Sequence, residues 1–330
     1  MELSDAKSRP VFVTETGLLS RVTAGIWPYR IVIALLVALV VTGSAFADRF
    51  GTARNLMNVL EQLATLALAA LGQTIVILIG GIDLSIGAVI SAASMLTSGL
   101  IDGQPERVVP VVVAVLMFGA AIGTLNGYLV ERLRVHSLIV TLGMASILQG
   151  ACLLYSRGPV GSVPREFEAL AFGRNFGVPI STMVVVAIYM LAWYLLRYTR
   201  TGRQLYAFGG ESAHARLLGI SGYRVQCVAF GASGLCAAVA GVFLVSRTGI
   251  GEPLAGSGFD LASVTPVVVG GTILAGGKGG VIGTFLGVLL VSLLNNVLNF
   301  LDVSTYYQWI IQGIIIISAV SMQLDRRRAA

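Results

Sequence analysis

Long apolar segments alternate with short polar ones along almost the whole chain. A helix of about 17–25 apolar residues can cross a bilayer. The pattern predicts ten such helices, near residues 26–46, 58–80, 85–101, 108–130, 137–156, 181–197, 224–245, 260–276, 280–300 and 305–321. Pairs of glycines at 80–81 and 270–271 blur two of the boundaries. We therefore expect an all-α integral membrane protein with one membrane domain over residues 26–322, between polar tails at 1–25 and 323–330.

One glycine pattern occurs twice in the chain. Each copy has three glycines at four-residue spacing, and the middle one lies in an Ile-Gly-Thr tripeptide; the six are Gly119, Gly123, Gly127, Gly279, Gly283 and Gly287. The GIDL run at 81–84 is likewise echoed by GFDL at 258–261. Because the two copies fall in segments expected to cross in opposite directions, they predict an inverted internal repeat, as in many transporters. Glycines at this spacing let helices approach closely, so we expect both triplets to pack helices.

The composition excludes a soluble domain. Hydrophobic residues make up 56% of the chain and charged residues 12%, with a mean hydropathy of +0.86. The net charge of +6 could suggest nucleic acid, but its distribution favours a membrane. With the N-terminus inside, 15 of the 22 Lys and Arg residues fall on the cytoplasmic side. Positive residues concentrate on that side, so we expect both termini in the cytoplasm, an uncleaved first helix and no nucleic-acid partner.

The longest inner connection, residues 198–223, is predicted to dock a cytoplasmic partner. Its run ESAHARLL, from Glu211 to Leu218, is compatible with a short helix, and glycines at 209, 210 and 219 delimit that run. Such a helix is too short to span, and the connection is long for an ordinary loop. An ordinary connection with an incidental helix is the alternative. The candidate coupling residues are Gly210, Glu211, Ser212, Ala213, His214, Ala215, Arg216, Leu217 and Gly219.

The chain carries no pattern of residues that indicates catalysis or a bound cofactor. GGKG at 276–279 lacks the Ser or Thr that follows the lysine in a phosphate-binding loop. The two histidines have no serine or cysteine partner pattern, and the three cysteines fall inside apolar segments without metal-ligand spacing. We therefore expect no enzyme, metal site or cofactor in this chain.

Few polar residues lie in the expected spans. Asp83 and Asp260 stand where helices are expected to begin, so helix capping is favoured over ligand contact, and a proton relay is less favoured. Carboxamides in the spans could line a path for an uncharged polar ligand or bond neighbouring helices, and the sequence favours neither role. The candidate pathway residues are Gln62, Asp83, Ser85, Asn126, Phe259, Asp260, Asn295 and Asn296.

Several motifs resemble one family over nearly the whole chain from about residue 50. They are GGIDLSIGAV at 80–89, VTLGMASILQG at 140–150, TRTGRQLYAFGGESAHARLLGI at 199–220, AGSGFDL at 255–261, VVVGGTILAGGKGGVIGTFLG at 267–287 and NNVLNFLDVSTYYQWIIQG at 295–313. Together they are similar to the permease subunits of bacterial ABC importers for monosaccharides, of the ribose, xylose and arabinose type. The chain departs from that family at GGESAH, where GGNEAA is usual, at Ala262, where an acid is frequent, and at Thr265-Pro266.

The resemblance implies a type II ABC importer permease in the bacterial inner membrane. It implies a second permease copy, as a homodimer or with a related chain, and a cytoplasmic ATPase with two nucleotide-binding halves that holds the ATP and Mg. It also implies a periplasmic sugar-binding protein. The scarcity of charge in the spans favours a neutral monosaccharide or polyol, moved by alternating access. The alternatives are an ion-coupled secondary transporter, or an ABC permease for nucleosides or branched-chain amino acids.

Overall fold

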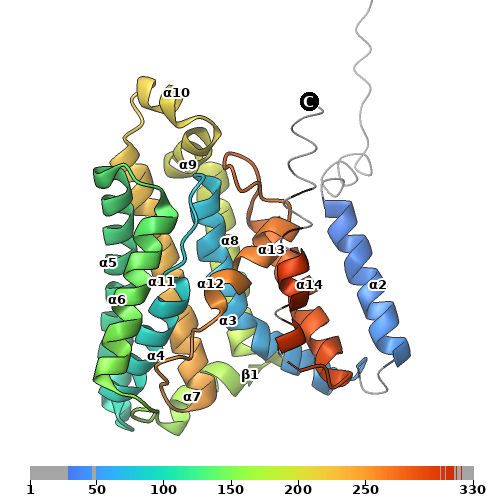
Figure 1. Ribbon diagram of the computed structural model, residues 1–330. Coiled ribbons are helices and arrows are strands. Elements are labelled where there is room, and N and C mark those ends of the chain that lie inside the picture. Colours follow the sequence, from blue (N-terminus) through green and yellow to red (C-terminus); the bar gives the residue numbers. More distant parts are fainter. Residues whose placement is uncertain are drawn as a thin grey trace, which may run out of the picture.

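A computed structural model describes residues 29–46, 50–304, 306–308, 310–315, 317 and 321, and almost all of its regular structure is helical (Figure 1). Both expected tails, 1–25 and 323–330, lie outside the described residues, and the tenth expected span is described only in part. The six described helices with the length and apolar character of membrane spans are α3 (Ala53–Leu78), α5 (Val108–Leu133, preceded by the 3-10 turn Pro105–Arg107), α6 (Ser137–Tyr155), α8 (Ile180–Tyr198), α11 (Gly222–Thr248) and α14 (Val281–Phe300).

Seven shorter helices complete the named helices of the described chain. They are α2 (Arg30–Phe46), α4 (Ile86–Ile101), α7 (Arg165–Phe172), α9 (Arg200–Gly210), α10 (Ser212–Leu217), α12 (Phe259–Ala262) and α13 (Val264–Val269). The strands β1 (Arg174–Asn175) and β2 (Val178–Pro179) form a small antiparallel hairpin in the register Arg174↔Pro179 and Asn175↔Val178. The helical membrane fold is therefore confirmed, while the count of ten spans stays a prediction.

Two irregular segments each lead into short helices, and we call each segment with its helices an interrupted span: residues 79–101 and 249–269. After α3 ends, residues 79–85 run without regular structure through the interior to the start of α4 (Figure 1). The reversal at Gly80 requires a φ of 79°, which a residue with a Cβ rarely adopts. In the same way, residues 249–258 lead irregularly into the short pair α12–α13. The prediction of one helix over residues 260–276 is therefore wrong in its second half. Helix α13 ends at Val269, and Gly271 takes a φ of 89° that does not continue a helix.

Helix α11 lies at the centre and packs against α3, α4 and α5. Its buried face is built of small residues, including Ala229, Ser233, Ala237 and Gly241. The first glycine triplet lies on the face of α5 that meets this surface, opposite the backbone of α11 at Gln226, Phe230 and Gly234. No Cβ fits at Gly119, Gly123 or Gly127, so these glycines bring α5 and α11 into backbone contact.

The second triplet packs a different pair of elements. Gly283 and Gly287 of α14 press on the carbonyls of Gly270 and Pro266, at the end of α13. Gly279 departs from the expectation of helix packing, because it precedes α14 in a turn with a φ of 130° against Thr272. Two of the three later glycines therefore pack a helix, and α13 rather than α11 is their partner. The inverted repeat stays a prediction.

The inner connection forms two helices rather than one. Helix α10 covers most of the expected run 211–218, and Gly219 follows it with a φ of 80°. The residues before it also fold, as α9, whose start is capped because the Thr199 hydroxyl accepts the Gly202 N–H at 3.2 Å. Apolar Leu205 and Phe208 bury one face of α9. Gly209 and Gly210 therefore end α9 instead of breaking the chain, and the break falls at extended Glu211.

Candidate functional site

A cavity of about 280 Å³ opens among α3, the end of α11, α12 and α14. Its polar lining consists of Gln62, Arg247, Ser257, Ser292, Asn295, Asn296, Asn299, Gln308 and Gln312. Val59, Leu66, Phe259 and Ala262 supply the apolar part. This volume lies near the lower end of the range of volumes found for small-molecule binding sites. A cavity with this lining offers hydrogen bonds to a compact polar ligand.

Pairs of carboxamides fix much of this lining. Asn55 and Asn296 exchange two hydrogen bonds, at 2.9 and 3.0 Å between their amide nitrogens and oxygens. Gln308 Nε2 donates to Asn299 Oδ1 at 2.7 Å. The Gln312 amide donates more weakly to Asn295, at 3.3 Å. These bonds hold α14 to α3 and to the helical residues after 305, so the lining is braced before a ligand arrives.

Four sequence-predicted pathway residues line this cavity: Gln62, Phe259, Asn295 and Asn296. Three further lining residues, Asn299, Gln308 and Gln312, belong to the carboxamides in the spans whose role the sequence left undecided. Arg247, Ser257 and Ser292 were missed. A signal for part of this set was present. Ser292, Asn295, Asn296 and Asn299 follow the spacing of one helix face, which separates a polar stripe from scattered polar residues.

Asp83, Ser85 and Asn126 form a separate buried network. Asp83 Oδ1 accepts hydrogen bonds from the Ser85 hydroxyl at 2.6 Å and the Ser85 N–H at 3.0 Å. Its other oxygen accepts from the Ser233 hydroxyl of α11 at 2.8 Å, and Asn126 Nδ2 of α5 donates to Ser85 at 2.9 Å. Asp83 is 1% exposed. The expected capping role is wrong for Asp83, because α4 begins at Ser85 without a side-chain cap. The bonds of Asp83 instead hold the irregular segment before α4 against α11.

The two interrupted spans meet next to the cavity. Gly87 in the first turn of α4 lies against Gly256, where an added Cβ would come within 2.6 Å of the Gly256 carbonyl oxygen. The Gly256 N–H in turn donates to the Ser91 hydroxyl at 2.9 Å. The starts of α4 and α12 are thereby brought together, with Asp260 half-buried in the first turn of α12. Asp260 does not line the cavity. In transporters, converging ends of interrupted helices lie at the ligand site.

Helix α10 presents a second candidate surface, at the opposite end from α7 (Figure 1). The predicted coupling residues there are exposed apart from Ala215, and Leu217 and the neighbouring Leu218 are 84% and 80% exposed. Glu211 and His214 pair across its solvent face at 2.9 Å. Two adjacent exposed leucines at the end of a short charged helix are typical of a contact surface for another protein.

Helix α10 is anchored to the membrane helices by one arginine. Both terminal nitrogens of Arg216 contact the Glu131 carboxylate of α5, at 2.6 and 2.9 Å. Hydrogen bonding to Glu131 raises the pKa of the Arg216 guanidinium, which therefore stays charged. The same guanidinium lies 5.4 Å from the centre of the Phe208 ring of α9. Arg216 thus joins α10, α9 and α5.

Comparison with known proteins extends over most of the chain. The family described as "Branched-chain amino acid transport system / permease component" matches residues 55–320. The chain is 39% identical to the ribose import permease protein RbsC of Escherichia coli (strain K12), over 87% of this chain and 91% of the relative. It is 34% identical to the D-allose transport system permease protein AlsC of the same strain, over 89% and 90%. It is 31% identical to the L-arabinose ABC transporter permease protein AraH of Azospirillum brasilense, over 93% and 92%.

No solved structure matches the chain. The family match covers the interrupted spans, the cavity and the inner connection. The apolar helices and these relatives indicate a multi-pass protein of the inner membrane. The chain belongs to this family of ABC transporter permease components and is a transport subunit rather than an enzyme.

Proposed function

We propose that this chain is the membrane-spanning permease subunit of an ATP-driven importer that carries a neutral monosaccharide or polyol into the cytoplasm by alternating access. The observation that carries the proposal is the cavity beside α12, whose polar lining is made of carboxamides, hydroxyls and one guanidinium. Carboxamides both donate and accept hydrogen bonds, as sugar hydroxyls do. The names of relatives that carry ribose, allose and arabinose support the same class of cargo.

The charge of the lining argues against an amino acid. A zwitterion needs a partner of each sign in a site with little water, because an unpaired charge there is costly. Arg247 could hold a carboxylate, but no carboxylate among the described residues lines the cavity to hold an ammonium group. A sugar needs neither charge, and its hydroxyls can accept hydrogen bonds from Arg247.

The proposal includes the partners. The exposed face of α10, carried on α9, supports docking of a separate ATPase with two nucleotide-binding halves. A periplasmic binding protein would deliver the sugar to the outer end of the cavity. A second permease copy, identical or related, would complete the membrane part. The two interrupted spans and the two Ile-Gly-Thr glycines support ten helices arranged as an inverted repeat.

The strongest rival is an ion-coupled secondary transporter. Such a carrier commonly needs intramembrane acids that titrate or bind the ion. In the described chain, Asp83 is closed off in its hydrogen-bond network, and Asp260 is outside the cavity lining. Branched-chain amino acids and nucleosides remain competing cargoes for an ABC permease, the former because of the family description.

Reconstitution separates these possibilities. The complete complex, with its ATPase and binding protein in vesicles, is offered labelled ribose, allose, arabinose, a polyol, a nucleoside and leucine in parallel. We expect uptake of one neutral sugar or polyol that requires ATP and the binding protein. Leucine uptake without sugar uptake would refute the cargo. Sugar uptake by the chain alone, driven by an ion gradient, would refute the ATP-driven mechanism.

A further inference from the structure

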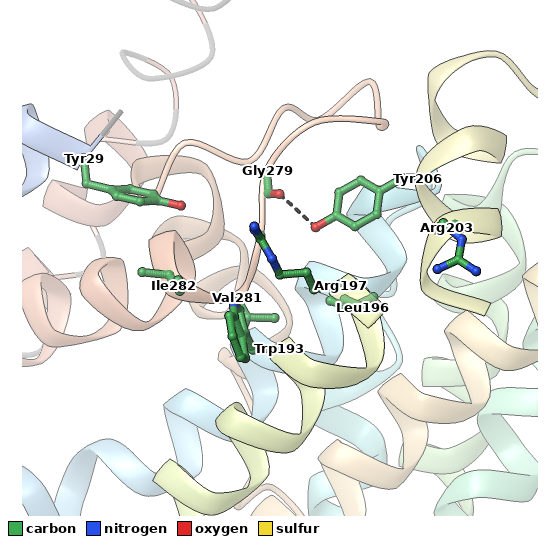
Figure 2. A pocket seen from close by; sticks show the side chains of 10 residues that line it. Tyr29, Trp193, Leu196, Arg197, Arg203, Tyr206, Gly279, Val281 and Ile282 are labelled. Atoms are coloured by element: carbon green, nitrogen blue, oxygen red, sulfur yellow. Dashed lines mark hydrogen bonds between the residues drawn. The ribbon is translucent and has the colours of Figure 1, made fainter. Parts of the chain in front are cut away.

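A second and larger cavity, of about 460 Å³, lies at the end of the molecule that carries the coupling helices. The end of α8, the middle of α9 and the start of α14 surround it, and Tyr29 closes the side nearest α2 (Figure 2). It is distinct from the pathway cavity, which lies between α3 and the opposite end of α14. The expected topology puts this larger cavity at the cytoplasmic edge of the bilayer.

The charged side chains that line this cavity are all positive. Arg197 and Arg203 line it, and no acidic residue does. Figure 2 shows Arg197 of α8 between Trp193 and the Gly279 carbonyl, whereas Arg203 of α9 lies apart from it, on the far side of Tyr206. In the described part of the chain, no carboxylate lies within ion-pair distance of either arginine. Arg203 donates only to the Tyr198 carbonyl, at 3.3 Å. Both guanidiniums are exposed and can take an anion.

Hydrogen-bond donors surround the same space. The α14 helix begins here without a side-chain cap, so backbone N–H groups of its first turn are available and carry a partial positive charge. Tyr206 donates its hydroxyl to the Gly279 carbonyl at 3.0 Å and so fixes the turn that leads into α14. The combination of the Arg197 guanidinium with a helix start suits a phosphate group, and Arg203 adds positive charge at the rim.

The remaining lining is apolar and faces outward. Trp193 is 38% exposed and Ile282 48% exposed, so an apolar wall runs from the cavity to the outer surface of the helices. Tyr and Trp side chains prefer the boundary between lipid tails and headgroups. A free phosphate ion would use the arginines but not this wall, whereas a phospholipid would use both.

We propose that this cavity binds the headgroup of an anionic phospholipid of the inner leaflet. Arg197 contacts the phosphate, Arg203 adds attraction at the rim, and the first acyl carbons lie along Trp193 and Ile282. Bound lipid would then touch α8, α9 and α14 together, and so brace the base of the coupling helices against the membrane domain. Basic pockets between helices on the cytoplasmic side hold anionic headgroups in this way.

The test uses the full chain purified in detergent and native mass spectrometry with phosphatidylglycerol or phosphatidylcholine of equal chain length. We expect phosphatidylglycerol to be retained in preference, and Arg197→Gln to weaken that retention about fivefold, as expected for one basic residue near anionic lipid. Arg203→Gln should have a smaller effect in the same direction. The control is Arg200→Gln, an exposed arginine of α9 outside the cavity, which should leave retention unchanged.

Three outcomes would overturn the proposal. One is equal retention of both lipids by the unchanged protein. Another is an equal effect of Arg200→Gln and Arg197→Gln, which would indicate general surface charge. The third is displacement of phosphatidylglycerol by millimolar inorganic phosphate, which would assign the site to the free ion. If an arginine variant unfolds, a second measurement tests the site: quenching of tryptophan fluorescence by brominated phosphatidylglycerol. A lipid bound beside Trp193 should quench the fluorescence of the unchanged protein more than that of its Trp193→Phe variant.

Discussion

Arg216 in α10 and Glu131 in the last turn of α5 form a two-point ion pair, with nitrogen–oxygen distances of 2.6 and 2.9 Å. Glu131 also lies against Gly222, the first residue of α11. A displacement of α10 therefore acts on α5 and α11 together. Because those two helices meet in backbone contact along the first glycine triplet, the pair connects the proposed ATPase surface to the centre of the membrane domain.

Reversal of the Arg216 charge should uncouple ATP hydrolysis from transport. Arg216→Glu places two carboxylates together, so α10 should separate from α5. We expect uptake to fall about tenfold, within the usual range of coupling energies. The loss of stability should exceed the value of about 1 kcal/mol typical of an exposed pair, because the Glu131 side chain that loses its partner is only 8% exposed. Uptake and ATPase activity are measured in the same vesicles.

A charge swap provides the control for that prediction. Glu131→Lys combined with Arg216→Glu should recover part of the uptake, because the ion pair forms again with reversed sign. Arg224→Glu, at an exposed arginine of the same end of the molecule, should leave uptake unchanged. Full uptake by Arg216→Glu in a complex that retains its ATPase would contradict the coupling role.

Adjacent glycines at the end of α9 should respond oppositely to alanine. Gly209 lies directly on the Leu78 carbonyl at the end of α3, and Gly277 donates its N–H to that carbonyl at 2.9 Å. No atom beyond its chain neighbours lies within 4 Å of a Cβ at Gly210. We expect Gly209→Ala to cost about 1–3 kcal/mol in unfolding free energy through overpacking, and Gly210→Ala to be neutral or slightly stabilising. Thermal unfolding in detergent measures both, and equal midpoints would refute this contact.

The sequence predicted the helices better than the places where they stop. The apolar runs gave the positions of α3, α5, α6, α8, α11 and α14, because helix length and hydropathy are local properties. The end of α13 was missed because residues 272–275 are as apolar as those of a membrane-spanning helix, so the hydropathy pattern continues past the last helical residue. The irregular backbone of these residues depends on distant contacts, such as the bond from Gly277 to Leu78.

The pathway residues were predicted only in part for a similar reason. A polar residue in a span can face a cavity or a neighbouring helix, and the sequence alone does not distinguish them. Asn126 faces Ser85 in a closed network, whereas Asn296 faces the cavity, although both are asparagines in apolar helices. Arg247 was missed because its place near the end of α11 suggested only a residue flanking the membrane.

Substitution of either matching glycine, Gly123 or Gly283, should destabilise the protein to a similar extent. Each lies on a backbone carbonyl of a neighbouring element, that of Phe230 or Gly270. Leucine at either position should force the helices apart and cost about 3 kcal/mol or more, or abolish assembly. Gly143→Leu in α6 is the control, because a Cβ there meets no atom within 4 Å. A harmless change at one matching position and a severe one at the other would weaken the proposed repeat.

Gln62 offers the sharpest test of the pathway, because it is exposed to the cavity and its loss should not unfold the protein. Gln62→Leu removes a donor and an acceptor but keeps a similar volume. One neutral hydrogen bond contributes about 0.5–1.5 kcal/mol, so we expect sugar uptake to fall by about twofold to tenfold. Leu56→Gln on the same helix is the matched control, since Leu56 is 51% exposed and outside the cavity. If Gln62→Leu transports normally while Leu56→Gln does not, the ligand passes along another face of α3, and the cavity is not the sugar path.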